Sequence, residues 1–361
     1  MIRVAFDAQA TQGQCSGLGV YTSNLLRALR KEIGDPFEFR VYTEERSDQR
    51  NINTAQRLSW ENWTLPRLVR NDRADILHVP AFAPAFWKPC KLVVTVHDIA
   101  GKLFKNQIGK LSAFYWGKWL PLVVRQADRI ITSSQHTRKD LVEHLRVREE
   151  KIRVIYPSGH ENFSSVIPAA QIAETKKRFG IRGRYFLFVG TLEPRKNLSR
   201  ILEAFRLFRN SRKEFQLVLV GSKAFAHGKY TESLAKEHAL DSESVIAPGF
   251  LEHDELNKLY CGAQGLLFPS LYEGFGIPIL EAMASGCPVL TSNLTSTPEV
   301  AGNAAILVDP YSVEAITQGM VQLGSSESLQ YDLRQKGLQQ IRKFSWKKTA
   351  REVIDVYKEL L

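Results

Sequence analysis

Two glutamates separated by seven residues, Glu273 and Glu281, are the first residues whose type and spacing suggest chemistry. They lie in the stretch FPSLYEGFGIPILEAMASGCPVLT, residues 268–291, whose pattern indicates a strand, a glycine-bearing turn, a short helix and a second strand. Pro278 suits the start of that helix, because its missing N–H would have no partner there. This places Glu273 in the loop and Glu281 about one turn into the helix.

The turn between the two carboxylates suits an anion. Gly274 and Gly276 let a ligand approach bare backbone, and the following helix offers free N–H groups at the positive end of its dipole. Carboxylates would repel the anion, so Glu273 and Glu281 are better explained as acceptors for hydroxyls attached to it. A phosphate-binding turn flanked by hydroxyl-binding groups is the arrangement expected of a nucleotide-sugar site.

The rest of the chain alternates strands and helices, which predicts doubly wound α/β domains. Several expected strands are continuous apolar runs rich in Val and Ile, as in a parallel sheet covered on both faces. In the first half the expected strands are Ile2–Ala8, Phe37–Thr43, Asp75–Pro80, Lys91–Ile99, Arg129–Ser134 and Arg153–Pro157, with helices at Val20–Lys31, around Ile108–Gln126 and at Gln135–Leu145.

Residues 159–170, with Ser, Gly and Pro168, interrupt this rhythm and are expected to link two domains. The pattern then restarts and ends in an amphipathic helix from about Ser345 to Leu361. The expected strands of the second half are Tyr185–Gly190, Phe215–Gly221, Ser244–Ala247, Gly265–Pro269, Pro288–Ser292 and Ala304–Val308. We therefore expect domains at 1–165 and 166–344, with 345–361 packing back on the first. Ligands of such sheets bind beyond the carboxyl ends of the strands.

Composition restricts the class of protein. The 361 residues are 44% hydrophobic, typical of globular domains. No apolar run reaches the length of a membrane span, and the N-terminal MIRVAFDAQA resembles a first strand rather than a signal peptide. The four cysteines contain no CxxC pair, which favours a reduced, cytoplasmic chain without structural zinc.

The net charge of +11 lies mostly in the first half of the chain. A basic surface suits nucleic acid, anionic lipid, a phosphorylated acceptor, or simply solvent. The segment 102–126 interleaves Lys with Phe, Tyr and Trp, which suits an interfacial helix or base stacking. A helix whose aromatic residues face the core would show the same pattern. No RNA-binding motif accompanies the segment, so lipid is preferred over nucleic acid.

Three further sites follow expected strands. Gly17 and Gly19, in GQCSGLGVY, lie between the first strand and helix, where backbone turns tightly or approaches a ligand. His97 and Asp98 end the strand KLVVTVHDIA, where a histidine can bind substrate or stabilise charge. Asp98 is a candidate for an acceptor hydroxyl. Each residue also has an ordinary structural explanation.

Arg195 and Lys196 follow the strand that ends at Gly190 and precede a helix. Two cations there can neutralise a diphosphate and stabilise the leaving group during bond cleavage. They oppose the helix dipole, which costs a little unless an anion is present. After the strand that ends at Gly249, the loop with Phe250 and Leu251 offers its backbone to a nucleobase.

The segments GTLEPRKN, GFLEHDEL, PSLYEGFGIPILEAMASGCPVLTSN and PEVAGNAAILVDP resemble the GT4 family of retaining glycosyltransferases, which have the GT-B architecture. The match covers most of the chain and is stronger in the second half. The spacing of Glu273 and Glu281 is similar to the EX7E motif of that family. The resemblance implies two Rossmann-like domains facing across a cleft, with the final helix crossing back to the first.

The resemblance also implies roles for individual residues. Glu273 would hold hydroxyls of the donor sugar and Glu281 the ribose, while Arg195 and Lys196 would bind the diphosphate. His97 would lie near the donor sugar. The remaining donor-binding candidates are Gly17, Gly19, Gly190, Phe250, Leu251, Phe275, Gly276 and Ile277.

Some family members carry arginine where this chain has Thr191. The threonine form is similar to bacterial mannosyl- and rhamnosyltransferases of O-antigen and exopolysaccharide assembly, which suggests GDP-mannose as donor. The expected activity is a metal-independent, retaining hexosyl transfer to a glycan or polyprenyl-diphosphate-linked hydroxyl, with no cofactor beyond the nucleotide sugar. We expect a cytoplasmic protein that contacts the inner face of the membrane. The alternatives are a UDP-glucose-dependent enzyme, an α-glucan synthase, a sugar-nucleotide epimerase, an inactive sugar-nucleotide-binding partner of a transferase, or a basic nucleic-acid-binding protein.

Overall fold

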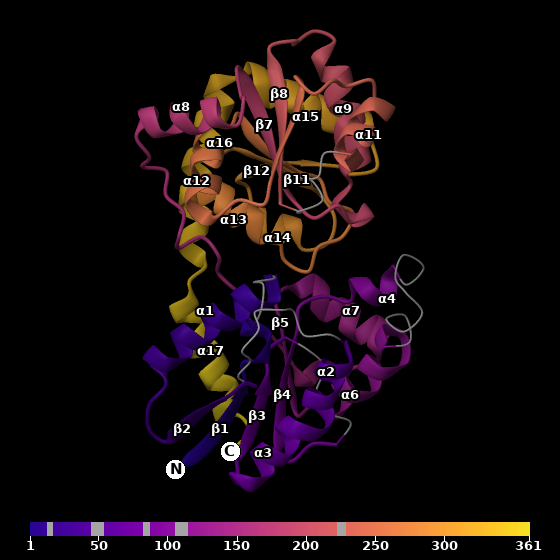
Figure 1. The fold of residues 1–361 in the computed structure, drawn as a ribbon. Helices are drawn as coiled ribbons and strands as arrows, with labels where there is room; N and C mark the ends of the chain where they lie inside the picture. Colours follow the sequence, from indigo (N-terminus) through magenta and orange to yellow (C-terminus); the bar gives the residue numbers. More distant parts are fainter. Residues whose placement is uncertain (13–16, 45–53, 82–86, 105–114, 222–228) are drawn as a thin grey trace. The chain divides into compact units, whose positions relative to one another are not determined.

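The chain forms two compact units, Met1–Pro157 with Phe344–Leu361, and Ser158–Lys343 (Figure 1). A computed structural model describes residues 1–12, 17–44, 54–81, 87–104, 115–221 and 229–361. Each unit contains a six-stranded sheet in which every pair of neighbouring strands is parallel. The expectation of two doubly wound α/β domains is confirmed.

The sheet of the first unit has the order β2-β1-β3-β4-β5-β6. The strand order reverses between β1 and β3, and ligands of doubly wound sheets bind at such a reversal. The strands are β1 Ile2–Asp7, β2 Phe37–Tyr42, β3 Ile76–Val79, β4 Lys91–Val96, β5 Arg129–Thr132 and β6 Ile152–Val154.

Helices connect these strands, and two of them begin after a π-helical turn. The described helices are α1 Gly17–Glu32, α2 Thr54–Ser59, α3 Leu65–Asn71, α4 Ala100–Leu103, α6 Leu120–Gln126, α7 Gln135–Leu145 and α17 Trp346–Lys358, with 3-10 turns at Gln9–Thr11 and Glu149–Lys151. The π turns span Trp60–Thr64 and Tyr115–Trp119. Each is followed by Leu-Pro, and the proline lacks the N–H and crowds the carbonyl four residues earlier. The widened turn is consistent with this, because the Leu65 N–H donates five residues back, to the Trp60 carbonyl.

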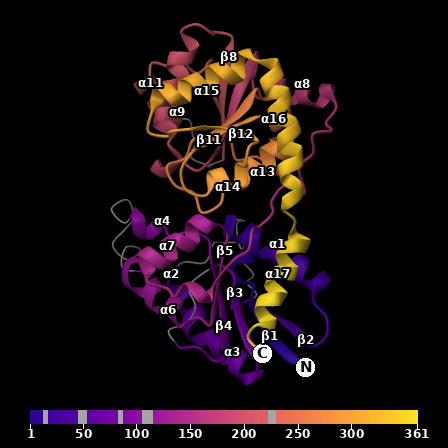
Figure 2. The ribbon, with the colours of Figure 1, turned by 180° about the vertical axis from the view of Figure 1, so that it is seen from behind.

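The final helix, α17, belongs to the first unit and packs along α1, as expected (Figure 2). Its Tyr357 is fully buried, and the phenol lies 2.7 Å from Nδ1 of His78 on β3. Arg351 pairs with Glu32 of α1 at 2.8 Å. Val353 and Trp346 join the apolar core of this sheet. The last turns of the chain therefore complete the core of the first unit.

The sheet of the second unit has the order β12-β11-β10-β7-β8-β9, with the reversal between β7 and β10. Its strands are β7 Arg184–Gly190, β8 Phe215–Gly221, β9 Val245–Gly249, β10 Gly265–Phe268, β11 Val289–Ser292 and β12 Ala305–Val308. Its described helices are α8 Ala169–Arg178, α9 Leu198–Arg209, α11 Lys229–Glu237, α12 His253–Gly262, α13 Ile277–Ala284, α14 Thr297–Ala301, α15 Val313–Ser325 and α16 Glu327–Gln340, with 3-10 turns at Pro194–Lys196 and Ile341–Lys343.

All twelve expected strands exist, although several end earlier than expected. One expectation about the first unit was wrong, and one helical region of it was not predicted. Gly17 and Gly19 lie inside α1 rather than in the loop before it. Thr54–Asn71, which had been assigned no element, forms helical turns. Part of the helix expected around Ile108–Gln126 lies outside the described residues, and its described part is the second π turn followed by α6.

Candidate active site

The loops that follow β7 and β10 carry most of the charged residues singled out in the second unit. These strands are neighbours at the reversal of strand order, so their carboxyl ends open on the place where such sheets bind ligands. After β7, the chain forms a 3-10 turn at Pro194–Lys196 before α9. After β10, it forms the loop that contains Glu273 and then enters α13.

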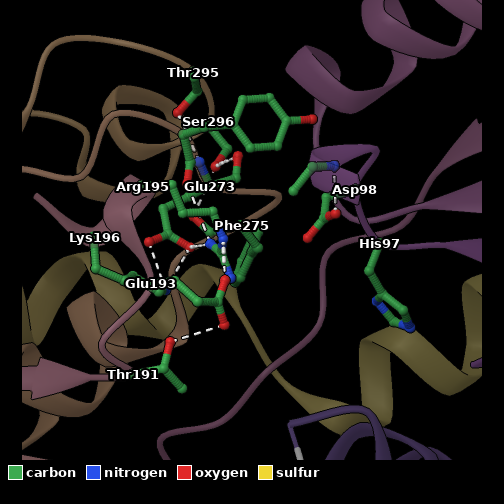
Figure 3. Close-up of polar contacts among 12 residues, drawn as sticks. His97, Asp98, Thr191, Glu193, Arg195, Lys196, Glu273, Phe275, Thr295 and Ser296 are labelled. Atoms are coloured by element: carbon green, nitrogen blue, oxygen red, sulfur yellow. Dashed lines mark hydrogen bonds and ion pairs between the residues drawn. The ribbon is translucent and has the colours of Figure 1, made fainter. Parts of the chain in front are cut away.

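Glu273 is held by the two cations of the neighbouring loop (Figure 3). Nζ of Lys196 donates to both carboxylate oxygens, at 2.7 and 2.9 Å. The guanidinium of Arg195 donates to Oε2 at 3.2 Å. The side chains of Glu273, Lys196 and Arg195 are 7%, 11% and 17% exposed. Charge-assisted hydrogen bonds of this kind are stronger than neutral ones, particularly where water is largely excluded.

Glu193 adds a second carboxylate to Arg195. Its Oε2 accepts from Nε of Arg195 at 2.6 Å, and its Oε1 accepts from the Thr191 hydroxyl at 2.9 Å (Figure 3). Burial opposes ionisation of Glu193, but the adjacent Arg195 and the Thr191 hydroxyl hold its pKa below the ordinary value. Thr191 therefore positions the ion-pair network, although it carries no charge itself.

Asn197 fixes the turn that presents Arg195 and Lys196. It is buried and has a left-handed backbone with φ 64°, a conformation that asparagine adopts more readily than most residues. Its Nδ2 donates to the carbonyls of Pro269 at 2.9 Å and Pro310 at 2.7 Å. The two loops are thus joined by hydrogen bonds as well as by ion pairs.

The loop that carries Glu273 is itself held by Thr295 and Ser296, which directly precede α14. The hydroxyl of Ser296 donates to the carbonyls of Glu273 and Phe275, both at 2.9 Å, and the hydroxyl of Thr295 accepts from the Glu273 N–H at 3.3 Å. Gly276 precedes α13 with φ 107°, and a Cβ there would lie 3.1 Å from a methyl of Ile279. Only glycine adopts this conformation without strain.

Glu281 lies on α13, at the expected distance from its start, and has a different partner. Its Oε2 accepts from the phenol of Tyr260, on α12, at 3.0 Å. Burial raises the pKa of Glu281 to about 7, against the opposing effect of that hydrogen bond. The carboxyl therefore changes charge near neutrality, and a hydroxyl-bearing ligand that donates to it would favour the ionised form.

The remaining donor candidates of this unit lie at strand ends. Gly190 closes β7, and a Cβ on it would lie 3.8 Å from the Lys196 side chain. After β9, Phe250 is 55% exposed, whereas Leu251 is 8% exposed. Their assignment to the donor stays a prediction.

In the first unit, His97 lies just beyond β4. Its Nε2 donates to the Pro80 carbonyl at 2.9 Å, since a carbonyl can only accept. Burial lowers the pKa of His97, so the ring is neutral at pH 7. The ring of Tyr21 packs edge-on at 4.3 Å between centroids. A neutral imidazole with a fixed tautomer suits hydrogen bonding to a substrate better than charge stabilisation.

Asp98 has a structural role in the described residues. Its Oδ1 accepts from the Ala100 N–H at 2.8 Å, at the start of α4. Gly17 and Gly19 lie in the first turn of α1, so any contact with phosphate would come from a helix N-terminus rather than from a flexible loop. Within the described residues, no group of three or more His, Cys, Asp or Glu is arranged to hold a metal ion.

Comparison with known proteins identifies the family. Residues 15–158 match the model of Glycosyltransferase Family 4, and residues 171–340 match that of Glycosyl transferases group 1. The chain is a family 4 glycosyltransferase. This transferase is 28% identical to the O-antigen chain mannosyltransferase B of Escherichia coli, over 99% of this chain and all of that protein. It is 31% identical to the MMP alpha-(1->4)-mannosyltransferase of Mycolicibacterium hassiacum, over 75% of this chain and 66% of that protein.

Solved structures support the GT-B fold of this glycosyltransferase. A sucrose-phosphate synthase from Thermosynechococcus elongatus superposes with a TM-score of 0.77 at 18% identity, covering 100% of this chain and 99% of that one. WaaG, a glycosyltransferase involved in lipopolysaccharide biosynthesis, superposes with a TM-score of 0.72 at 17% identity, covering 98% and 99%.

The sequence analysis did not predict the residues that hold the charged side chains of the site in place. Glu193, Asn197 and Ser296 hold Arg195, Lys196 and Glu273 in place, and Tyr260 binds Glu281. A signal existed for Asn197, because asparagine directly after a Pro-x-x turn favours a left-handed residue. No local pattern distinguishes Tyr260 or Ser296, whose partners lie elsewhere in the chain.

Proposed function

We propose that this glycosyltransferase moves mannose from GDP-mannose to a hydroxyl of a glycan or polyprenyl-diphosphate-linked acceptor, in the synthesis of a cell-surface polysaccharide. The assignment of the donor site rests on one observation, the pairing of Glu273 with Lys196 and Arg195 at the reversal of strand order. The choice of sugar is supported by relatives named O-antigen mannosyltransferases.

Each residue of the network has a role in this proposal. Lys196 and Arg195 bind the diphosphate, and the start of α13 offers its backbone N–H groups to the same charge. Glu273 accepts hydrogen bonds from hydroxyls of the mannose. Glu281 accepts from the ribose. His97 is proposed to hydrogen-bond the sugar that is transferred.

The proposed reaction keeps the anomeric configuration. The bond between the anomeric carbon and the diphosphate oxygen breaks, and the acceptor oxygen bonds to the same face of that carbon. The acceptor proton passes to the departing diphosphate. The cations stabilise the negative charge that develops there. Because Glu273 already accepts from two cations, it is better suited to binding hydroxyls than to attacking the sugar as a nucleophile.

A donor panel tests this function. Purified protein is mixed with GDP-mannose, UDP-glucose, dTDP-rhamnose and other nucleotide sugars, and both thermal stabilisation and slow donor hydrolysis are measured. The proposal expects stabilisation and hydrolysis with GDP-mannose, both weakened in Lys196→Ala and retained in Lys213→Ala, a lysine outside the network. A response to UDP-glucose alone would overturn the choice of donor. An NMR spectrum of the product that shows inverted configuration would overturn the proposed stereochemistry.

We also propose that the reaction needs no metal ion and no cofactor beyond the nucleotide sugar. The diphosphate charge is instead met by Lys196, Arg195 and the N-terminus of α13. Turnover in excess chelator tests this proposal, because the rate should remain within about twofold of the untreated rate. Loss of turnover that Mn²⁺ restores would contradict it.

We propose in addition a peripheral contact with anionic membrane through the described part of residues 102–126. Leu103 and Leu122 are 39% and 48% exposed, and Lys118 on the preceding π turn is exposed. Trp116 is not available as an anchor, because its indole packs against Gly101. No helix in the described ranges is both long and apolar enough to cross a membrane.

Co-sedimentation with vesicles tests the membrane contact. Binding should rise when phosphatidylglycerol is added to phosphatidylcholine vesicles, and it should fall with salt. Leu122→Asp with Lys118→Glu should abolish it, whereas Lys176→Glu in the second unit should not. Equal binding by both variants would contradict the assignment to this segment.

A further inference from the structure

A cluster of buried polar side chains lies at the carboxyl end of β1, and the donor site proposed above does not use it. Asp7, Gln9 and Glu61 are 3%, 0% and 2% exposed. Asp7 is the last residue of β1, and β1 borders the reversal of strand order in the first sheet. This is the edge at which a doubly wound sheet binds ligands.

Short contacts join these residues. Oδ1 of Asp7 accepts from the Gln9 N–H and from the indole of Trp60, both at 3.0 Å. Trp60 and Glu61 begin the first π turn, and such turns are frequent at functional sites. Oε1 of Glu61 lies 3.4 Å from Nε of Arg57, one helical turn earlier.

The cluster is incomplete. Both carboxylate oxygens of Glu61 and the Nε2 of Gln9 have no hydrogen-bond partner among the described residues. Buried polar atoms are almost always hydrogen-bonded, because an unmade bond costs the full desolvation of the group. Three such atoms near one strand end, with Oε1 of Glu61 in an ion pair with Arg57, make the cluster a candidate for hydrogen bonds to a ligand.

Ionisation is also unfavourable here. Burial raises the pKa of Asp7 to about 6 and that of Glu61 to about 8. Arg57 opposes the rise for Glu61, and the neighbouring Asp7 adds to it. A ligand that donates hydrogen bonds to these carboxyls would relieve the cost of their charge.

The hydrogen-bonding groups of the cluster indicate which class of ligand it would bind. Two carboxyl groups repel an anion, and the described residues offer no set of three metal-binding side chains. Carboxylates accept from hydroxyls, and a carboxamide N–H donates to a hydroxyl or ring oxygen. A compound with neighbouring hydroxyls satisfies both kinds of group. The ring of Tyr115, over which the Arg57 guanidinium lies at 4.9 Å, adds apolar surface.

We propose that Asp7, Gln9 and Glu61 bind the hydroxyls of the terminal sugar of the acceptor. The inference rests on the proposed function, since it presumes that this glycosyltransferase uses a sugar acceptor. It assigns acceptor specificity to the carboxyl end of β1, separately from the donor residues of the second unit.

Kinetics on two variants test the proposal. Octyl glycosides of mannose, glucose, galactose and N-acetylglucosamine serve as probes, and the one that the wild type turns over fastest is kept. Glu61→Leu and Asp7→Asn should each raise the KM for that glycoside by about tenfold or more, because one or more hydrogen bonds between a sugar hydroxyl and a buried carboxyl group are lost. The affinity for GDP, measured by calorimetry, should remain within about twofold.

Glu38→Gln is the matched control. Glu38 lies on β2 and pairs with Arg3 and Arg40, so it is a paired glutamate of the same unit near the opposite end of the strands. This control should leave the KM for the glycoside unchanged. Circular dichroism and melting temperature identify variants that fail to fold, and the isosteric Glu61→Gln then replaces Glu61→Leu, with the same direction of effect expected.

Two outcomes would overturn the proposal. An unchanged KM with a raised melting temperature would show that Glu61 is a buried acid with no part in acceptor binding. A parallel loss of GDP affinity would show that the cluster supports the donor site or the fold. Failure of the proposed function is a separate result, because the wild type itself would then make no product with any donor and glycoside.

Discussion

The ammonium of Lys196 lies 2.7 and 2.9 Å from the two carboxylate oxygens of Glu273, a residue 77 positions later in the chain. Arg195 also donates a hydrogen bond to this carboxylate. The carboxylate proposed to bind the sugar therefore offsets part of the charge of the two cations proposed to bind the diphosphate, and Glu193 offsets more of it through Arg195. A donor must either share these cations with Glu273 or displace it from them.

This competition predicts opposite effects of Glu273→Gln on binding and on turnover. Removing the negative charge should strengthen binding of free GDP by about three- to tenfold, because Glu193 then remains as the carboxylate that offsets the charge of the two cations. Transfer should fall by about a hundredfold or more, since a charged hydroxyl acceptor is lost at the reacting sugar. Calorimetry with GDP and initial rates with GDP-mannose measure the two effects.

Glu243→Gln is a suitable control for this prediction. Glu243 pairs with Arg182 at 3.6 Å, and both side chains are highly exposed. The control should change neither quantity. Weaker GDP binding by Glu273→Gln would show that Glu273 preorganises the cations instead of competing for them.

Asn197 should be essential to the geometry of the Arg195–Lys196 turn. Asn197→Gly keeps the left-handed backbone and loses both hydrogen bonds to the carbonyls, which should lower the free energy of unfolding by about 1–2 kcal/mol. Asn197→Ala should cost about 1 kcal/mol more, because alanine is strained at φ 64°. Chemical denaturation measures both variants, and equal stabilities would contradict the backbone argument. Both should bind GDP more weakly.

The stability contributed by Glu281 should depend on pH. Because burial raises its pKa from 4.5 to about 7, the folded chain binds a proton that the unfolded chain releases between these values. Its stabilising contribution is thus complete below pH 4.5 and is lost as the pH rises through about 7. The difference in free energy of unfolding between wild type and Glu281→Gln should shift by about 3 kcal/mol from pH 4.5 to 7.5, in favour of the variant at the higher pH. A difference that does not change with pH would contradict the raised pKa.

The hydrogen bond between Tyr357 and His78 should anchor α17 to the first sheet. Tyr357→Phe removes only the hydroxyl and leaves Nδ1 of the buried His78 without that partner, so the free energy of unfolding should fall by about 1–3 kcal/mol. Hydrogen exchange should then rise along α17 first. Tyr331→Phe, at an exposed tyrosine of the second unit, should leave both measurements unchanged.

Much of the fold follows from local pattern. Continuous apolar runs identify several of the twelve strands, because a strand buried on both faces has to be apolar throughout. The glycines and Pro278 place Glu273 in a loop and Glu281 in a helix. The early start of α1 was missed, because Gly17 and Gly19 have low helix propensity, yet α1 packs against α17, and tertiary packing commonly outweighs propensity.

The sequence by itself determined which residues carry charge and which strand end each one follows. Only the tertiary structure decided their partners. Lys196 meets Glu273 because β7 and β10 are neighbours in the sheet although β8 and β9 separate them along the chain. Tyr260 meets Glu281 across 21 positions of the chain, and Trp60 meets Asp7 across 53. Such pairs depend on strand order and on the packing of whole elements, which hydrophobic periodicity does not encode, because it reports only the face that each element buries.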